Sequence, residues 1–337
     1  MRAETKDVKM MRKTILEKFG FSVGCSILMG VFCLAAMSES VPPLEEYKDS
    51  VKIAAVQMVI EEEFLQEHDS VDALIPYMER AQQDQVDLLV FPEYLLGNFK
   101  IPDPLTDKLC AEANKHNLNV IVGGWEYLPG EEFSHPPKEG TFSNTGLVVS
   151  REGKIVGKHR KMHPACGAKS PYDWPPEENE VSEILMKLGE EPTVVDLDFG
   201  RIGLLTCYDG YFFPTFEIPS LKGAEILVWI NGRGGAIEDY IVKTASFMTC
   251  THVVATNQSM GAGTMICAYP ANVVENVTKP GEAYISSTLD LQFLRDQRKN
   301  NRMFHQRRPN AYKDLVKEWE PWEAYPFIEP FRYPESE

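Results

Sequence analysis

The sequence predicts an α/β fold in which layered sheets are covered by helices. Two observations predict it. From residue 51 onward, short apolar runs of strand character alternate with amphipathic segments of helical character. The 337 residues are 43% hydrophobic and 25% charged, which is typical of a globular protein with a sizeable core.

The first part of this region, residues 51–127, predicts three strands separated by two helices. The run VKIAAVQMVI is typical of a buried strand, whereas SVDALIPYMERAQQDQ repeats its apolar residues at helical spacing. The expected segments are strands at 51–60, 86–94 and 118–127 and helices at 70–85 and 105–117.

The second part begins with a β-hairpin. Residues 143–163 contain two β-rich runs around the turn REGK, and an acidic, proline-rich connection follows over 171–192. The remaining expected segments are a strand pair around Gly200 within 193–209, a strand at 224–232, a helix at 237–251 and a strand at 252–259.

The overall charge argues against a nucleic-acid partner. The formal net charge is -16, and the one dense basic run is GKHRKMH. Phosphate binding needs a clustered basic surface, so we expect no nucleic-acid partner and instead a small-molecule ligand.

The first fifty residues differ from the rest. Cations in KMMRKTILEK precede an apolar run, FGFSVGCSILMGVFCLAAM, and small residues follow near Ser38. This order is typical of a cleaved signal peptide over residues 1–38, although the run is also long enough for an uncleaved N-terminal membrane anchor. The expectation is an exported protein, secreted or periplasmic, or one anchored in a membrane by the same segment, with residues 39–50 as a linker.

The cysteines do not predict a disulfide framework. Beyond residue 38 there are five, with wide spacings and no C-x-x-C pair, so neither a set of disulfides nor a structural zinc site is expected. Their positions are Cys110, Cys166, Cys207, Cys250 and Cys267. At least one of them must therefore be free.

Three chemically active residues each follow a predicted strand. Glu93 lies in LLVFPEY, Lys161 in GKHRKMH and Cys207 in GLLTCYD. Ligands and chemistry commonly gather at the carboxyl ends of strands in α/β folds. Brought together, a carboxylate can accept the thiol proton, an ammonium can stabilise negative charge and a thiolate can attack an electrophilic carbon.

The segments around these residues resemble the nitrilase superfamily of carbon-nitrogen hydrolases. FPEY resembles its glutamate motif, GKIVGKHRKMHP its lysine motif and GRIGLLTCYDGYFFPTFEIPSLKGAEILVW its cysteine motif, in the same order. A late HQRRPNAY resembles a further segment of the family, so the similarity covers residues 51–315. This leaves 316–337 as an aromatic C-terminal tail.

The resemblance implies a four-layer α-β-β-α sandwich and a Glu-Lys-Cys triad that needs no metal or cofactor. In this triad Glu93 is the general base, Lys161 stabilises the tetrahedral intermediate and Cys207 forms a thioester. The lysine directly after the arginine fits the motif, which selects Lys161 over Lys158.

Further site residues are expected around this triad. The backbone N–H of Tyr208 is the expected second oxyanion donor. The family implies another glutamate, for which Glu183 is the choice and Glu178 and Glu180 are rivals. Arg233, in a loop after a strand, is expected to meet a polar or anionic substrate group.

The sequence does not favour a metal site at the two histidines of the basic run. His159 and His163 are four residues apart, but zinc hydrolases with that spacing carry them on a helix, whereas this stretch follows a strand and ends in Pro164.

These observations predict a hydrolase that cleaves a linear amide or N-carbamoyl C–N bond of a small molecule through an acyl-cysteine. Nitrile hydrolysis and a catalytically silent binding protein on the same fold are the alternatives. The enzyme is expected to form a homo-oligomer.

Overall fold

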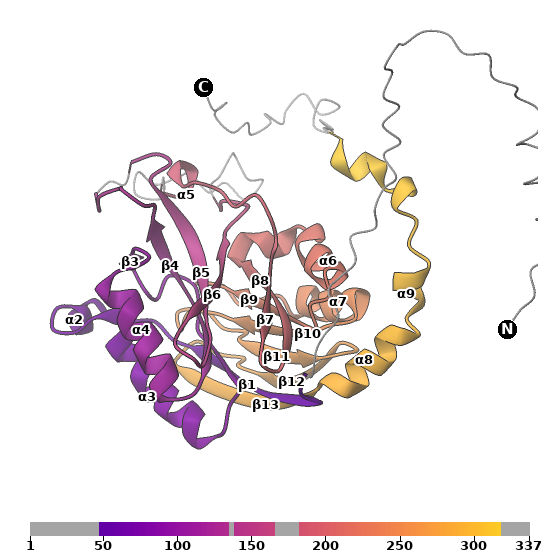
Figure 1. The fold of residues 1–337 in the computed structure, drawn as a ribbon, viewed down its shortest axis with the longest axis horizontal. Helices are drawn as coiled ribbons and strands as arrows, with labels where there is room; N and C mark the ends of the chain where they lie inside the picture. The colour runs from indigo at the N-terminus through magenta and orange to yellow at the C-terminus, as the bar shows by residue number, and fades with distance from the viewer. Residues whose placement is uncertain (1–46, 135–137, 166–181, 318–337) are drawn as a thin grey trace, which may run out of the picture. The chain divides into compact units, whose positions relative to one another are not determined.

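The computed structural model describes residues 47–134, 138–165 and 182–317, which form two β-sheets with helices on their outer faces (Figure 1). The first sheet has the strand order β13-β1-β2-β4-β5-β6, with β3 paired to β4, and the second has the order β12-β11-β10-β9-β8-β7. The predicted α-β-β-α sandwich is therefore confirmed.

The strands of the first sheet come from both ends of the described chain. They are β1 (Ser50–Gln57), β2 (Leu88–Val90), β3 (Asn98–Phe99), β4 (Asn119–Tyr127), β5 (Phe142–Val149), β6 (Ile155–Arg160) and β13 (Ala283–Asp290). The strands of the second sheet are β7 (Thr193–Leu197), β8 (Gly200–Thr206), β9 (Ile226–Ile230), β10 (His252–Thr256), β11 (Met265–Ala268) and β12 (Asn272–Asn276).

The two sheets pack face to face through alternate side chains of their strands. In β1, Val51, Ile53 and Ala55 belong to the core between the sheets, together with Ile226 and Val228 of β9. Because successive side chains of a strand point to opposite faces, the residues between them face the outer helices. This double burial explains why the strands read as continuous apolar runs.

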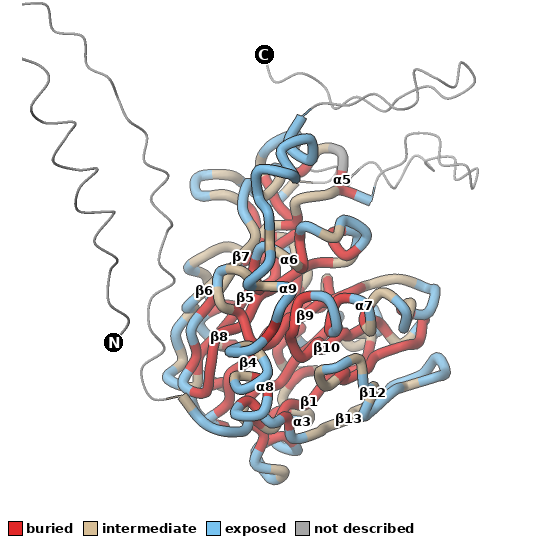
Figure 2. Tube along the Cα trace, turned by 90° about the vertical axis from the view of Figure 1, so that its right-hand side faces the viewer, coloured by how far each residue is buried: buried red, intermediate tan, exposed pale blue. Residues whose placement is uncertain are grey.

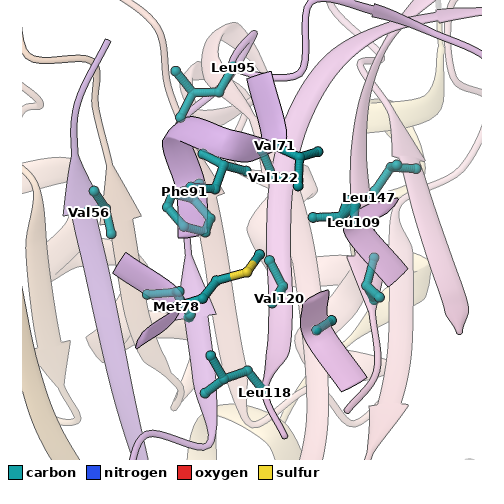
Figure 3. Close-up of a cluster of buried hydrophobic side chains, with 14 of the residues drawn as sticks. Val56, Val71, Met78, Phe91, Leu95, Leu109, Leu118, Val120, Val122 and Leu147 are labelled. Atoms are coloured by element: carbon teal, nitrogen blue, oxygen red, sulfur yellow. The ribbon is translucent and has the colours of Figure 1, made fainter. Parts of the chain in front are cut away.

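Helices cover both outer faces. On the first sheet lie α3 (Ser70–Gln83) and α4 (Pro104–Lys115), and on the second lie α6 (Pro214–Leu221) and α7 (Asp239–Thr249). Figure 3 shows the first of these outer cores, where Met78 and Leu109 of the helices meet Val56, Val120 and other strand residues. The burial map has the same pattern, with buried strands inside and exposed helix surfaces outside (Figure 2).

The remaining helical segments are short or lie near the chain end. They are α2 (Glu62–Leu65), α5 (Ser182–Leu185), α8 (Leu291–Lys299), α9 (Arg302–His305) and the 3₁₀ turns η1 (Cys207–Tyr211), η2 (Pro309–Ala311) and η3 (Lys313–Val316).

Most predicted elements are present, with shorter bounds. The predicted hairpin is the antiparallel pair β5–β6, and the strand pair around Gly200 is β7–β8. The strand expected over 86–94 is limited to Leu88–Val90. Phe91 and Pro92 still bond to Ile121 and Gly123 of β4, but Pro92 has no N–H with which to continue the ladder. The boundaries at residues 51 and 315 remain predictions, and residues 1–46 and 318–337 lie outside the described part.

Candidate functional site

The ends of three strands bring Glu93, Lys161 and Cys207 into one cluster. Glu93 follows β2, Lys161 follows β6 and Cys207 follows β8. Glu93 and Lys161 are fully buried, whereas Cys207 retains some solvent exposure. The two sheets thus contribute opposite sides of the cluster, the carboxylate and ammonium from the first sheet and the thiol from the second.

Lys161 holds two carboxylates together. Its Nζ lies 2.6 Å from Oε1 of Glu183 and 3.2 Å from Oε1 of Glu93. Asn144 of β5 bonds the same two oxygens through its Nδ2, at 2.6 Å to Glu93 and 3.2 Å to Glu183. The Tyr94 hydroxyl also donates to Oε1 of Glu183. A buried ammonium is stable only when opposite charges compensate it. Here Glu93 and Glu183 supply that charge, and Asn144 and Tyr94 hold the two carboxylates by hydrogen bonds.

Asn144 and Tyr94 are site residues that the sequence analysis did not identify. Asn144 has a weak signal, since it lies between the polar residues Ser143 and Thr145 and no pattern distinguishes it from them. Tyr94 follows Glu93 directly and has a positive φ of 70°, which no sequence pattern indicated.

Glu93 keeps one carboxylate oxygen without a partner. Its Oε1 accepts from Lys161 and Asn144, while its buried Oε2 has no hydrogen bond among the described residues. A side chain at position 232 would reach this oxygen, since a Cβ on Gly232 would lie 3.2 Å from it and 2.6 Å from the Tyr94 ring. The glycine therefore permits the loop after β9 to approach the carboxylate closely.

Cys207 sits on a tight turn between β8 and η1. Its φ is +45°, in the left-handed region that costs energy for a residue with a Cβ, and Trp229 Nε1 donates to its carbonyl oxygen at 2.7 Å. Burial, with the charges of Glu93 and Glu183 adding to it and Lys161 opposing it, raises the pKa of the Cys207 thiol to about 12. The thiol is therefore neutral at pH 7.

The ionised partners have shifted pKa values as well. Burial raises the pKa of Glu93, with the neighbouring Glu183 adding to the shift and Lys161 opposing it. Burial alone would lower the pKa of Lys161, but the carboxylates of Glu93 and Glu183 outweigh it and hold the pKa well above its usual range. For Glu183 burial is likewise outweighed, mainly by Lys161, so its pKa is lowered. The cluster thus contains the Lys161 ammonium, the Glu183 carboxylate with a lowered pKa and the Glu93 carboxylate with a raised pKa.

Asp209 connects the lysine loop to the cysteine turn. Its Oδ2 lies 2.9 Å from His159 Nε2 and accepts from the Thr206 N–H at 3.2 Å. Its Oδ1 lies 2.9 Å from His163 Nδ1 and accepts from the backbone N–H groups of Met162 and His163. Against the effect of burial, these bonds lower the pKa of Asp209 below its usual range. His159 and His163 therefore bind the Asp209 carboxylate. Among the described residues, no group of three His, Cys, Asp or Glu side chains is suited to hold a metal ion.

The other predicted residues fall into two groups. Glu183 lies on Lys161, as described above, whereas Glu178 and Glu180 lie outside the described residues. Tyr208 is the second residue of η1, where the first backbone N–H groups of a helix have no partner within the helix. Arg233 pairs with Glu238, whose Oε2 lies 2.6 Å from Nη2, while its buried Nε has no partner among the described residues.

Comparison with known proteins shows the same fold and family. The carbon-nitrogen hydrolase family matches residues 52–299. A probable nitrilase of Schizosaccharomyces pombe is 24% identical over 253 residues, which cover 68% of this chain and 85% of the relative. The omega-amidase NIT3 of Saccharomyces cerevisiae is 26% identical over 266 residues, 71% of this chain and 87% of the relative. A carbon-nitrogen hydrolase structure from Helicobacter pylori G27 superposes with a TM-score of 0.64 at 17% identity, covering 80% of this chain and 100% of that one.

The two facing sheets and their helices define an α-β-β-α hydrolase fold, and the family match covers most of it. The chain belongs to the carbon-nitrogen hydrolase family and is an amidase-type hydrolase.

The location predicted from residues 1–38 is wrong. The relatives are omega-amidases and nitrilase homologues, and none of those named here is described as secreted or membrane-anchored. Cations before an apolar run do not by themselves distinguish a targeting segment from other apolar sequence, so the pattern was over-interpreted. Residues 1–38 lie outside the described part of the chain. No helix of the described part is long and apolar enough to cross a membrane.

Proposed function

We propose that the chain hydrolyses the C–N bond of a small linear amide through a thioester on Cys207, with Glu93 as the base. The unpartnered Oε2 of Glu93 carries this proposal, because it is the open oxygen of a buried carboxylate whose other oxygen is bonded to Lys161 and Asn144. Buried polar atoms without partners are rare and indicate an unfilled role. A raised Glu93 pKa suits a group that must accept a proton and later return it.

The reaction begins when the Cys207 proton moves to Oε2 of Glu93 as the sulfur attacks the amide carbon. The negative charge that forms on the carbonyl oxygen is stabilised by the Lys161 ammonium and the Tyr208 N–H. Glu93 then protonates the departing nitrogen, the C–N bond breaks and the acyl group remains on sulfur. A water molecule gives its proton to Glu93 and attacks the thioester, which releases a carboxylic acid and restores the thiol.

The neutral thiol favours this coupled transfer over a preformed thiolate. With its pKa raised to about 12, Cys207 loses its proton only as the S–C bond forms. Glu183 and Asn144 hold Lys161 and Oε1 of Glu93 in place during both half-reactions. Glu183 acts as an auxiliary residue in this scheme.

The names of the relatives support amides as the substrate class. They include an omega-amidase of Saccharomyces cerevisiae and a deaminated glutathione amidase of Bos taurus. N-carbamoyl compounds undergo the same acyl transfer, so a substrate panel includes both, with nitriles as a comparison.

Replacing Cys207 with serine tests the proposal. We expect Cys207→Ser to reduce ammonia release by about a thousandfold, since a serine proton is harder to remove. Cys110→Ser is the matched control, because Cys110 lies in α4 and has no contact with the cluster described above. Turnover by Cys207→Ser at the rate of the Cys110→Ser variant would exclude a thioester on this residue.

We also propose that the enzyme is a homo-oligomer. Helices α6 and α7 expose several large apolar side chains on the outer face of the second sheet: Ile218, Tyr240, Phe247 and Met248. Large apolar side chains exposed on neighbouring helices favour an interface, because association removes their surface from water. Sedimentation equilibrium tests this, and a monomer at micromolar concentration contradicts it.

A further inference from the structure

Arg233 is already paired with a carboxylate of its own chain. Nη2 lies 2.6 Å from Oε2 of Glu238, and Nη1 lies 3.3 Å from Oε1 of the same group. The Tyr211 hydroxyl donates to Oε1 of Glu238 at 2.7 Å and accepts from Nη1 of Arg233. The three side chains form a hydrogen-bonded network, called here the Arg233–Glu238 pair with Tyr211. The buried Nε of Arg233 has no partner among the described residues.

This pair borders the reaction site. Tyr211 belongs to η1, the turn that begins with Cys207. The Arg233 Cζ lies 5.4 Å from the centroid of the Trp229 ring, and the Trp229 indole donates to the Cys207 carbonyl. Arg233 is also near enough to oppose the increase in the pKa of Cys207. The residue before it, Gly232, lies against Glu93 and Tyr94.

Glu238 serves Arg233 rather than its own helix. It occupies the N-cap position of α7, yet its side chain makes no capping hydrogen bond. The side chains of Arg233 and Glu238 are only 19% and 24% exposed, so each charge depends on the other for compensation. The loop beside them is open, since a Cβ on Gly234 or Gly235 would meet no atom within 4 Å.

The pair has no net charge to offer a substrate. A carboxylate approaching Arg233 must lie beside the Glu238 carboxylate or displace it. A neutral substrate group is not repelled by the Glu238 carboxylate and does not need to displace it. Of the polar or anionic substrate group expected from the sequence, this pairing favours the polar one.

We propose that the Arg233–Glu238 pair with Tyr211 makes this site select small amides that are uncharged at the end distant from the scissile C–N bond, against amides that carry a carboxylate there. This inference rests on the proposed function, because it assigns the substrate class of the same site.

The test compares two substrates of matched length, succinamate and 4-hydroxybutanamide, by kcat/KM for ammonia release. The wild type is expected to prefer the neutral amide at least tenfold. Glu238→Gln leaves Arg233 unbalanced and should reduce this preference at least tenfold. Arg233→Gln leaves Glu238 unbalanced and should increase it. Asp239→Asn is the matched control, since it removes a carboxylate from the next residue, which pairs with Lys243 instead, and should leave the preference unchanged.

A second readout separates this inference from the proposed function. Calorimetry on Cys207→Ala, with and without Glu238→Gln, measures binding of both amides without turnover. The same shift of preference in binding supports the inference. The inference is overturned, while thioester hydrolysis stands, if succinamate is the better substrate of the wild type. It is also overturned if Glu238→Gln changes neither the kcat/KM ratio nor the affinity ratio of the two amides. If Cys207→Ser retains wild-type turnover, the proposed function fails whichever substrate is preferred.

Discussion

Replacing Asp209 with asparagine tests whether this carboxylate holds the lysine loop and the cysteine turn together. Asparagine retains one acceptor oxygen and puts an NH₂ donor in place of the other. In either orientation a donor then faces at least one backbone N–H, that of Thr206 or those of Met162 and His163. A buried donor without an acceptor costs about 1–3 kcal/mol, and the lost charge weakens the remaining bonds.

The expected loss of stability is therefore about 3 kcal/mol. At about 2–4 °C for each kcal/mol, the melting temperature should fall by about 6–12 °C. Differential scanning calorimetry at pH 7 measures it. Because Lys161 and Cys207 follow the two connected segments, kcat/KM for a small amide should also fall by about 10–100-fold.

The pH dependence gives a second check. The folded-state pKa of Asp209 is lowered, so its stabilisation is complete above the unfolded-state pKa and is lost as pH falls toward the folded-state value. The difference in melting temperature between wild type and Asp209→Asn should therefore narrow below about pH 4. A change no larger than that of Asp239→Asn, about 0.5 kcal/mol for an exposed pair, would refute the bridging role of Asp209.

Three further predictions concern the cluster and the chain bounds. Glu93→Gln should reduce kcat by at least about a hundredfold. Because the pKa of Glu93 is raised, the acid limb of the wild-type pH profile of kcat/KM should lie above the usual glutamate pKa. An acid limb at or below that value contradicts the assignment of Glu93 as the base. Iodoacetamide should label Cys207 slowly at pH 7 and faster as pH rises. Labelling of Lys161→Ala should be slower than that of the wild type at the same pH, because Lys161 lowers the thiol pKa. Equal labelling rates across pH 6–10, with Cys207→Ser as the blank, contradict a neutral thiol. Residues 45–337 should retain full activity, since the described fold starts before β1 with Tyr47 and Lys48, which contact Arg295. Inactive protein from this fragment, under conditions where the full chain works, would show that activity needs residues 1–44.

The layers of the fold were predictable because both faces of each strand are buried. The apolar runs around Ile53 and Val228 predict strands buried on both faces. The turn between β5 and β6 is indicated by the sequence REGK. The short β2 was less predictable, since the apolar pattern and the bonds to β4 continue to Phe91 and Pro92, whereas the regular strand ends at Val90.

The cluster was predictable where residues follow strands and fit motifs. Glu93, Lys161 and Cys207 satisfy both conditions, and Glu183 lies where the acidic connection reaches Lys161. Asn144 and Asp209 were not identified as contacts, because their roles depend on which strands become neighbours across the two sheets. The pairing of Arg233 was missed for the same reason, since Glu238 lies past a loop whose path the sequence does not specify.

Detection of the acyl-enzyme tests the central claim most directly. Enzyme quenched in acid during turnover of a small amide is digested and its peptides are weighed, with a parallel reaction in hydroxylamine to capture the acyl group. The account predicts an acyl mass on the peptide that contains Cys207 and hydroxamate formation in competition with acid. An acyl group on another residue, or turnover with neither adduct nor hydroxamate, would contradict it.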